Sequence, residues 1–139
     1  SKGTVTMKKI LVAYDGGEPA FHALDTAAEL AQLTGAAISV ISVVPAREGR
    51  FPADPWDDVS THAQELLEAR ELLLEKGLEA ELLEPTGDPA MTIERVAEEG
   101  DFDTVVVGSR GLNLMSRVLM GSVSEHVATH AKATVVVAR

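Results

Sequence analysis

The sequence contains no cysteine, which excludes disulfide bonds and cysteine-ligated zinc. Basic residues are also scarce, since 12 lysines and arginines stand against 22 aspartates and glutamates, and the formal net charge is −10. A chain this acidic repels nucleic-acid phosphates and anionic membranes unless it concentrates its few cations in one place. We therefore expect no nucleic-acid partner and no docking on a membrane surface. The lack of cysteine fits a reducing compartment, and we expect a cytoplasmic protein.

Long apolar runs are absent as well. No stretch approaches the ~20 residues that a membrane-spanning helix needs. The first residues, SKGTVTM, have neither the apolar core nor the cleavage site of a signal peptide. We expect Met7 to begin the domain, with residues 1–6 an added or disordered N-terminal extension. Two standard nucleotide motifs, G-x-x-x-x-G-K-[ST] and G-x-G-x-x-G, do not occur anywhere in the chain.

What the chain does contain is the composition of one ordinary globular domain. Its 139 residues are 45% hydrophobic and 24% charged. Short apolar runs recur along it, and four of the five are continuously apolar, which is typical of parallel strands covered on both faces. The third run is more polar and is expected at a sheet edge. The expected strands are Lys8–Tyr14, Ala37–Val44, Glu79–Pro85, Thr104–Gly108 and Thr134–Arg139.

Helical patterns separate these strands. The first stripe contains Ala20, Leu24, Ala27, Ala28 and Ala31, with Gly35 closing the helix, and the second contains Val59, Ala63, Leu66, Leu67, Leu73 and Leu74, closed by Gly77. The third has Asp88 as N-cap and Pro89 in the first turn, then Ala90, Ile93 and Ala97 facing the core and Gly100 at the end, and the fourth contains Val123, Val127 and Ala131.

Alternating strands and helices predict an α/β fold, with a parallel sheet, right-handed crossovers and four helices distributed on both faces. We expect a single domain over residues 7–139. In an open sheet of this kind, ligands bind beyond the carboxyl ends of the strands, where the strand order reverses. The loops expected there are Asp15–Pro19, Pro45–Asp58, Thr86–Pro89 and the glycine-containing segment after the fourth strand.

That segment, Val105 to Val127, runs from a strand through three glycines into a helix. Gly108, Gly111 and Gly121 would let the backbone approach phosphate oxygens, and the helix that begins at Ser122 offers unpaired N–H groups and a partial positive charge. A structural alternative is a capping box, because Ser122 and Glu125 have the S-x-x-E spacing. The two roles can coexist, because a helix start has more donors than one cap uses.

The spacing G-x2-G-x9-G-[ST] after the fourth strand resembles the ATP-binding pattern of the universal stress protein family. KKILVAYDG, GDPAMTIERVAEEGDFDTVVVGSRG and GSVSEHVATHAKATVVVAR resemble its first, central and C-terminal blocks, so the resemblance covers Met7 to Arg139. It implies an open doubly wound sheet of five parallel strands in the order 3-2-1-4-5. It also implies a homodimer that pairs the last strands, Thr134–Arg139. Such pairing would cover an edge that is otherwise prone to aggregation.

The resemblance assigns roles to individual residues. Gly108, Gly111, Gly121 and Ser122 match positions that hold ribose and phosphates, and Val123 follows as a further backbone donor. Asp15 matches an acidic position near adenine and ribose, although it could also cap the first helix. Ala13 and Val43 match apolar positions around the adenine. Arg110 lies inside the glycine loop, where it could screen phosphate charge or face solvent.

The first loop departs from the family pattern. Where relatives often have D-G-S-x-x-S, this chain has Asp15, Gly16 and Gly17 and then Ala20, so two hydroxyls are missing. The four histidines show no metal-like clustering, and we predict no metal ligand and no catalytic residue.

The resemblance favours a regulatory protein that binds ATP, ADP or AMP, with or without Mg²⁺, and whose protein partner is unknown. A slow ATPase or phosphotransferase is the first alternative, and an interaction module that binds no nucleotide is the second.

Overall fold

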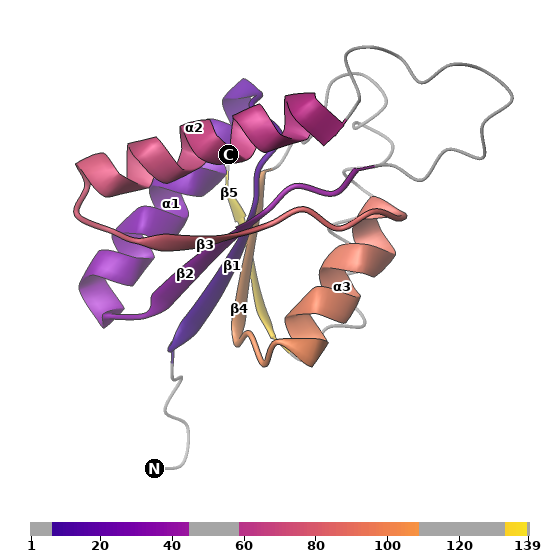
Figure 1. The fold of residues 1–139 in the computed structure, drawn as a ribbon. Helices are drawn as coiled ribbons and strands as arrows, with labels where there is room; N and C mark the ends of the chain where they lie inside the picture. Colours follow the sequence, from indigo (N-terminus) through magenta and orange to yellow (C-terminus); the bar gives the residue numbers. More distant parts are fainter. Residues whose placement is uncertain (1–6, 45–58, 109–132, 139) are drawn as a thin grey trace, which may run out of the picture.

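The computed structural model describes residues 7–44, 59–108 and 133–138 (Figure 1). Its strands are β1 (Lys9–Ala13), β2 (Ala37–Ile41), β3 (Ala80–Leu83), β4 (Thr104–Gly108) and β5 (Thr134–Ala138), and its helices are α1 (Glu18–Thr34), α2 (Val59–Glu75) and α3 (Pro89–Glu99). Every described element was expected at its place in the chain. The fourth expected helix, with Val123, Val127 and Ala131, lies outside the described residues, as does the extension at residues 1–6.

The strands form one parallel sheet in the order β3-β2-β1-β4-β5, which confirms the predicted topology. β1 occupies the centre, with Val12 paired with Val40 of β2 on one side and Val106 of β4 on the other. The three inner residues of β1 are fully buried, as the continuous apolar run predicted. The more polar β3 lies at an edge, also as predicted, and its Glu81 is exposed.

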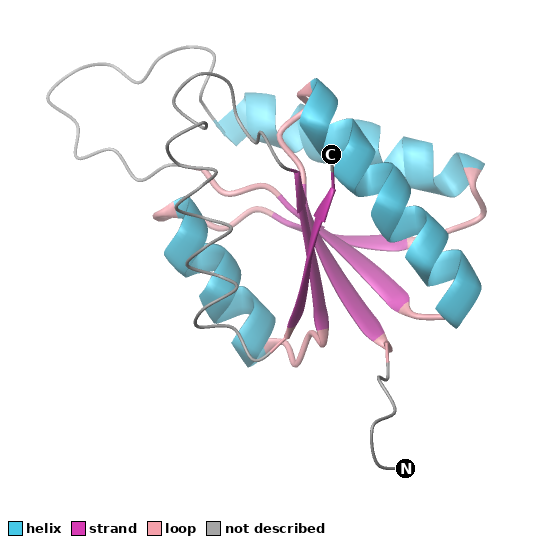
Figure 2. Cartoon of the chain, turned by 180° about the vertical axis from the view of Figure 1, so that it is seen from behind, coloured by secondary structure: helices cyan, strands magenta, loops and turns pink. Residues whose placement is uncertain are grey.

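Helices cover both faces of the sheet (Figure 2). α1 and α2 pack together on one face, against side chains such as Val12, Val40 and Val106. α3 covers the opposite face, where Ile93 and Ala97 pack against Leu11 and Val105. Adjacent strand residues thus serve two separate cores, because side chains alternate between the faces. Within the described ranges, no helix combines the length and the apolarity that crossing a bilayer requires.

The helix ends follow the local chemistry expected from the sequence. Gly35 ends α1 in the left-handed conformation, at φ 75°, and donates its N–H to the carbonyl of Ala31. Asp88 caps α3 by accepting a hydrogen bond of 3.0 Å from the backbone N–H of Met91, with Pro89 at the first helical position. Both ends satisfy backbone groups that a helix leaves without internal partners.

The apolar stripe predicted for α2 is partly wrong. Leu66 and Leu73 are buried, but Leu67 and Leu74 are 46% and 49% exposed. The fully buried Ala69 completes the inner face instead. The inner residues follow the spacing i, i+3, i+7, and each exposed leucine lies one residue, or about 100°, farther round the helix.

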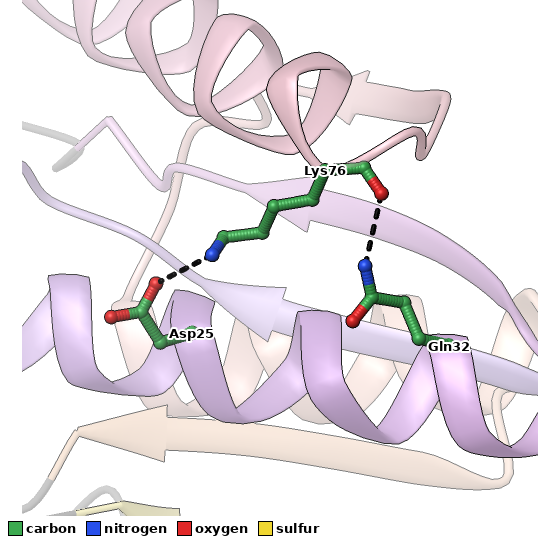
Figure 3. A network of polar contacts seen from close by, with 3 residues as sticks. All are labelled: Asp25, Gln32 and Lys76. Carbon is green, nitrogen blue, oxygen red and sulfur yellow. Dashed lines mark hydrogen bonds and ion pairs between the residues drawn. The ribbon is translucent and has the colours of Figure 1, made fainter.

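Polar contacts join the carboxyl-terminal end of α2 to α1 (Figure 3). The side-chain amide of Gln32 donates to the carbonyl of Lys76 over 2.9 Å, and the ammonium of Lys76 lies 3.7 Å from a carboxylate oxygen of Asp25. Exposed ion pairs contribute little to stability. The buried contacts between the two helices therefore carry most of their attachment.

Asp103 joins the amino-terminal ends of three strands. Its carboxylate accepts hydrogen bonds from the backbone N–H groups of Lys8 and Lys9, at 2.7 and 3.1 Å, and from the hydroxyl of Thr104 at 2.9 Å. Its backbone carbonyl accepts from the N–H of Thr134 at 2.8 Å. One residue thereby sets the starts of β1, β4 and β5 relative to each other.

We predict that Asp103→Ala lowers the free energy of unfolding by about 2 kcal/mol, because it removes charge-assisted hydrogen bonds from two backbone donors, of which that of Lys9 is half-buried. Urea unfolding followed by circular dichroism measures this change. Glu99→Ala, at an exposed position on α3, is the control and should change stability by less than about 0.5 kcal/mol. Equal effects of the two substitutions would show that the hydrogen bonds of Asp103 do not stabilise the starts of these strands.

Candidate functional site

The strand order reverses at β1, so the predicted crevice lies at the carboxyl ends of β1, β2 and β4. Two of the predicted site residues meet there. Ala13 ends β1, and Val43 lies two residues beyond Ile41, which is the register partner of Ala13. Both side chains are half-buried and pack on the face of the sheet that α3 covers. They form an apolar wall at the end of the sheet.

Beside this wall, the hydrogen-bond ladder between β1 and β2 stops. Its last bond is donated by the N–H of Tyr14 to the carbonyl of Ile41 over 3.0 Å. The chain that follows β2 still bonds on its other side, where Ser42 donates to Leu83 and Val44 to Pro85. By the alternation of backbone groups, the N–H and C=O of Val43 point toward β1. No hydrogen bond joins either of them to another group in the described part of the chain.

Asp15 and the two glycines after it form the turn between β1 and α1. A carboxylate oxygen of Asp15 accepts from the N–H of Gly17 over 2.9 Å, which fixes the turn. Gly17, and not Asp15, is the N-cap of α1, so the alternative role of Asp15 as a helix cap is wrong. Gly16 has φ 81°, and a Cβ there would lie 3.1 Å from Oε2 of Glu65. Any larger residue at position 16 would be strained and crowded.

Of the predicted phosphate-binding residues, the structure describes Gly108. It is the buried last residue of β4 and pairs in register with Ala138. Gly108 therefore lies at the carboxyl end of the strand next to β1, where the binding site is predicted. The other residues predicted there lie outside the described part of the chain: Arg110, Gly111, Gly121, Ser122 and Val123.

Four polar residues that were not predicted as site residues form hydrogen bonds where α2 packs against the ends of β1 and β2. The hydroxyl of Tyr14 donates to Oε1 of Glu68 over 2.6 Å. Ser42 Oγ and His62 Nδ1 lie 2.6 Å apart, and both residues are buried. One signal was available, because Ser42 and His62 interrupt patterns that are otherwise apolar. Within the described ranges, no group of three or more potential metal ligands occurs.

The environment of Tyr14 keeps its hydroxyl protonated. Burial is the largest cause of a pKa well above the ordinary value of 10.0, and the hydrogen bond to Glu68 adds to it. The negative charges of Glu68, Glu65 and Asp15 raise the pKa further. Tyr14 is therefore a permanent hydrogen-bond donor at physiological pH.

Comparison with known proteins agrees with this architecture. Universal stress protein YxiE of Bacillus subtilis is 32% identical over 147 residues, which cover 94% of this chain and 98% of the relative. A universal stress protein crystallised in complex with cAMP has a TM-score of 0.76 at 23% identity and covers 95% of this chain and 97% of its own. A universal stress protein of Archaeoglobus fulgidus in complex with dAMP has a TM-score of 0.74 at 23% identity, covering 98% and 100%.

The strand order, which reverses at the central β1, and the helices on both faces define a doubly wound α/β protein. Residues 6–139 match the universal stress protein family. The chain belongs to that family, which confirms the resemblance drawn from its motifs.

We predict that the phenolate absorbance of this protein does not appear near pH 10 while the chain is folded. The chain has a single tyrosine, so ultraviolet titration reports on Tyr14 alone. Because the folded pKa is raised, the contribution of Tyr14 to stability is complete below about pH 10 and is lost as the pH rises above it.

Tyr14→Phe is the matched variant for the second measurement. The unfolding free energy of the unsubstituted protein should fall more steeply with pH above about 10 than that of the variant. Ionisation of Tyr14 near pH 10 in the folded protein, or identical slopes for the two proteins, would contradict the role given to burial and to Glu68.

Proposed function

We propose that the crevice binds an adenine nucleotide and that the protein is a nucleotide-dependent stress regulator. The observation that carries the proposal is the backbone of Val43, which presents an N–H and a C=O side by side at the end of the ladder. Adenine carries a matching pair on its Watson–Crick edge, an acceptor at N1 and a donor at N6. Guanine has the opposite polarity at these positions. The crevice therefore favours adenine.

The side chains around Val43 fit the remaining parts of such a ligand. Ala13 and Val43 supply apolar surface for the faces of a base. Asp15, at the end of β1, lies where a carboxylate can accept a hydrogen bond from a ribose hydroxyl. Gly108 begins the glycine pattern expected to hold the phosphates, which continues through Gly111 and Gly121 to Ser122.

The relatives support the same ligand class, because two structurally similar universal stress proteins were crystallised in complex with cAMP and dAMP. We propose ATP as the ligand of this chain, with ADP or AMP as alternative ligands of the same site and with Mg²⁺ bound through the phosphates. Arg110 would screen phosphate charge, and Val123 would add a backbone donor. We further propose that the protein acts in the cytoplasm as a homodimer and signals by binding rather than by turnover.

The open edge of β5 supports the dimer. β5 ends the sheet and has one partner strand among the described elements. The N–H of Thr134 points toward β4, where it donates to Asp103. By alternation, the N–H groups of Val135 and Val137 point outward. A second copy of the strand could pair with these groups and cover the edge.

We predict that Ala13→Leu weakens ATP binding by roughly tenfold or more, because the larger side chain would enter the space proposed for the base, and added volume in a packed contact costs about 1–3 kcal/mol. Isothermal titration with ATP and Mg²⁺ measures the affinity, and assay of ADP in the same samples tests for turnover. Ala37→Leu is the control, because it makes the same change at the exposed amino-terminal end of β2. The proposal fails if the unsubstituted protein does not bind ATP, and steady formation of ADP would favour the ATPase.

We predict that Val137→Pro shifts the protein from dimer to monomer. Proline removes an outward N–H and leaves the ladder to β4 intact, so pairing of edges should weaken by roughly tenfold or more. Sedimentation velocity at several concentrations measures the shift. Val137→Thr retains the N–H and is the control. A dimer that persists unchanged in the proline variant would place the interface elsewhere.

A further inference from the structure

Three polar side chains on α2 lie along the face that packs against the strand ends. His62, Glu65 and Glu68 are spaced by three residues, so they follow one side of the helix. His62 contacts Ser42 after β2, Glu65 lies against Gly16, and Glu68 accepts from Tyr14. Farther along the helix, the inner face is apolar. Beside the ends of β1 and β2, α2 is thus attached by hydrogen bonds between His62 and Ser42 and between Glu68 and Tyr14.

The contact between Ser42 and His62 is the most enclosed of the three. The two residues are 2% and 7% exposed, and Oγ and Nδ1 are 2.6 Å apart. Burying a hydroxyl and an imidazole is unfavourable unless they bond each other, and two apolar residues in their place could give similar stability. What the polar pair adds is direction, because a short hydrogen bond restricts both the distance and the rotation between the helix and the strand end.

Ser42 directly precedes the residue that carries the proposed binding edge. On the side of β3, the backbone is held by bonds of 2.9 Å from Ser42 to Leu83 and 2.8 Å from Val44 to Pro85. On the side of β1, the ladder has already ended. The side chain of Ser42 points to the face that α2 covers, opposite to the side chain of Val43. The bond to His62 therefore anchors this segment from a third direction.

We propose that Ser42 and His62 are positioning residues that set the backbone of Val43 for recognition of the adenine base. This inference rests on the proposed function and assigns the selectivity of that site to a hydrogen bond outside it. The bond holds Val43 in the orientation in which its N–H and C=O meet N1 and N6. Without it, the segment can shift, and the advantage of adenine over guanine declines.

The test compares Kd for ATP and for GTP, measured by titration calorimetry with Mg²⁺. Ser42→Ala should lower the ratio of GTP Kd to ATP Kd by roughly tenfold, the effect expected from misplacing one base contact. Ser39→Ala is the matched control, because Ser39 is a buried serine within β2, three residues before Ser42, and faces the other core. It should leave the ratio unchanged.

A double variant, Ser42→Ala with His62→Leu, distinguishes an effect on the position of the Val43 backbone from an effect on the stability of the fold. It replaces the polar pair with an apolar one, so we expect a midpoint of thermal unfolding close to that of the unsubstituted protein with the ATP preference still reduced. Restored preference in this variant, a parallel loss of ATP and GTP affinity in Ser42→Ala, or no change in either would overturn the inference. If the unsubstituted protein binds neither nucleotide, the proposed function fails as well.

Discussion

The candidate site depends on the point at which β1 leaves the sheet. Along the paired lengths of β1 and β2, the facing backbone groups of the two strands bond each other. The last bond of this ladder is donated by the N–H of Tyr14 to the carbonyl of Ile41. The segment after β2 then bonds for a few residues with the end of β3 and the residues after it. This difference in length leaves the N–H and C=O of Val43 without a hydrogen-bond partner among the described residues, at the edge where the strand order reverses. The proposed binding edge is therefore a consequence of one early turn, which Asp15 and Gly16 make possible.

The charges around this edge also give the proposed ligand a direction. Asp15, Glu65 and Glu68 lie close enough to Tyr14 to raise its pKa, so the field beside β1 and α2 is negative. Phosphate groups would be repelled there, whereas a base and a ribose hydroxyl would not. The phosphates should therefore extend toward β4 and Gly108, where the glycine pattern begins. An acidic protein can thus bind an anionic ligand if its own carboxylates lie on one side of the site and the ligand's phosphates on the other.

The fold was largely predictable because its signals are local. Continuous apolar runs predicted the buried strands, glycine and the Asp88-Pro89 pair predicted helix ends, and the alternation predicted the parallel sheet. The strand order came from the resemblance to the family and not from periodicity. The prediction that Leu67 and Leu74 are buried was wrong, because the spacing of apolar residues along a helix does not indicate how wide a surface its partners cover. Here Leu66, Ala69 and Leu73 pack against the sheet and α1, whereas Leu67 and Leu74 remain partly exposed to solvent.

By itself, the sequence determined the class of fold and the end of the sheet at which the candidate site lies, and both follow from residue type and spacing. The resemblance to the family added Ala13, Val43 and Gly108 at that end. The tertiary structure alone decided that the ladder ends at Tyr14, that Asp15 forms a turn and does not cap α1, and that His62 reaches Ser42. These facts depend on where two segments distant in sequence meet, and periodicity within one segment contains no information on such a meeting. A histidine on α2 and a serine after β2 acquire a joint role only when packing brings them within 2.6 Å.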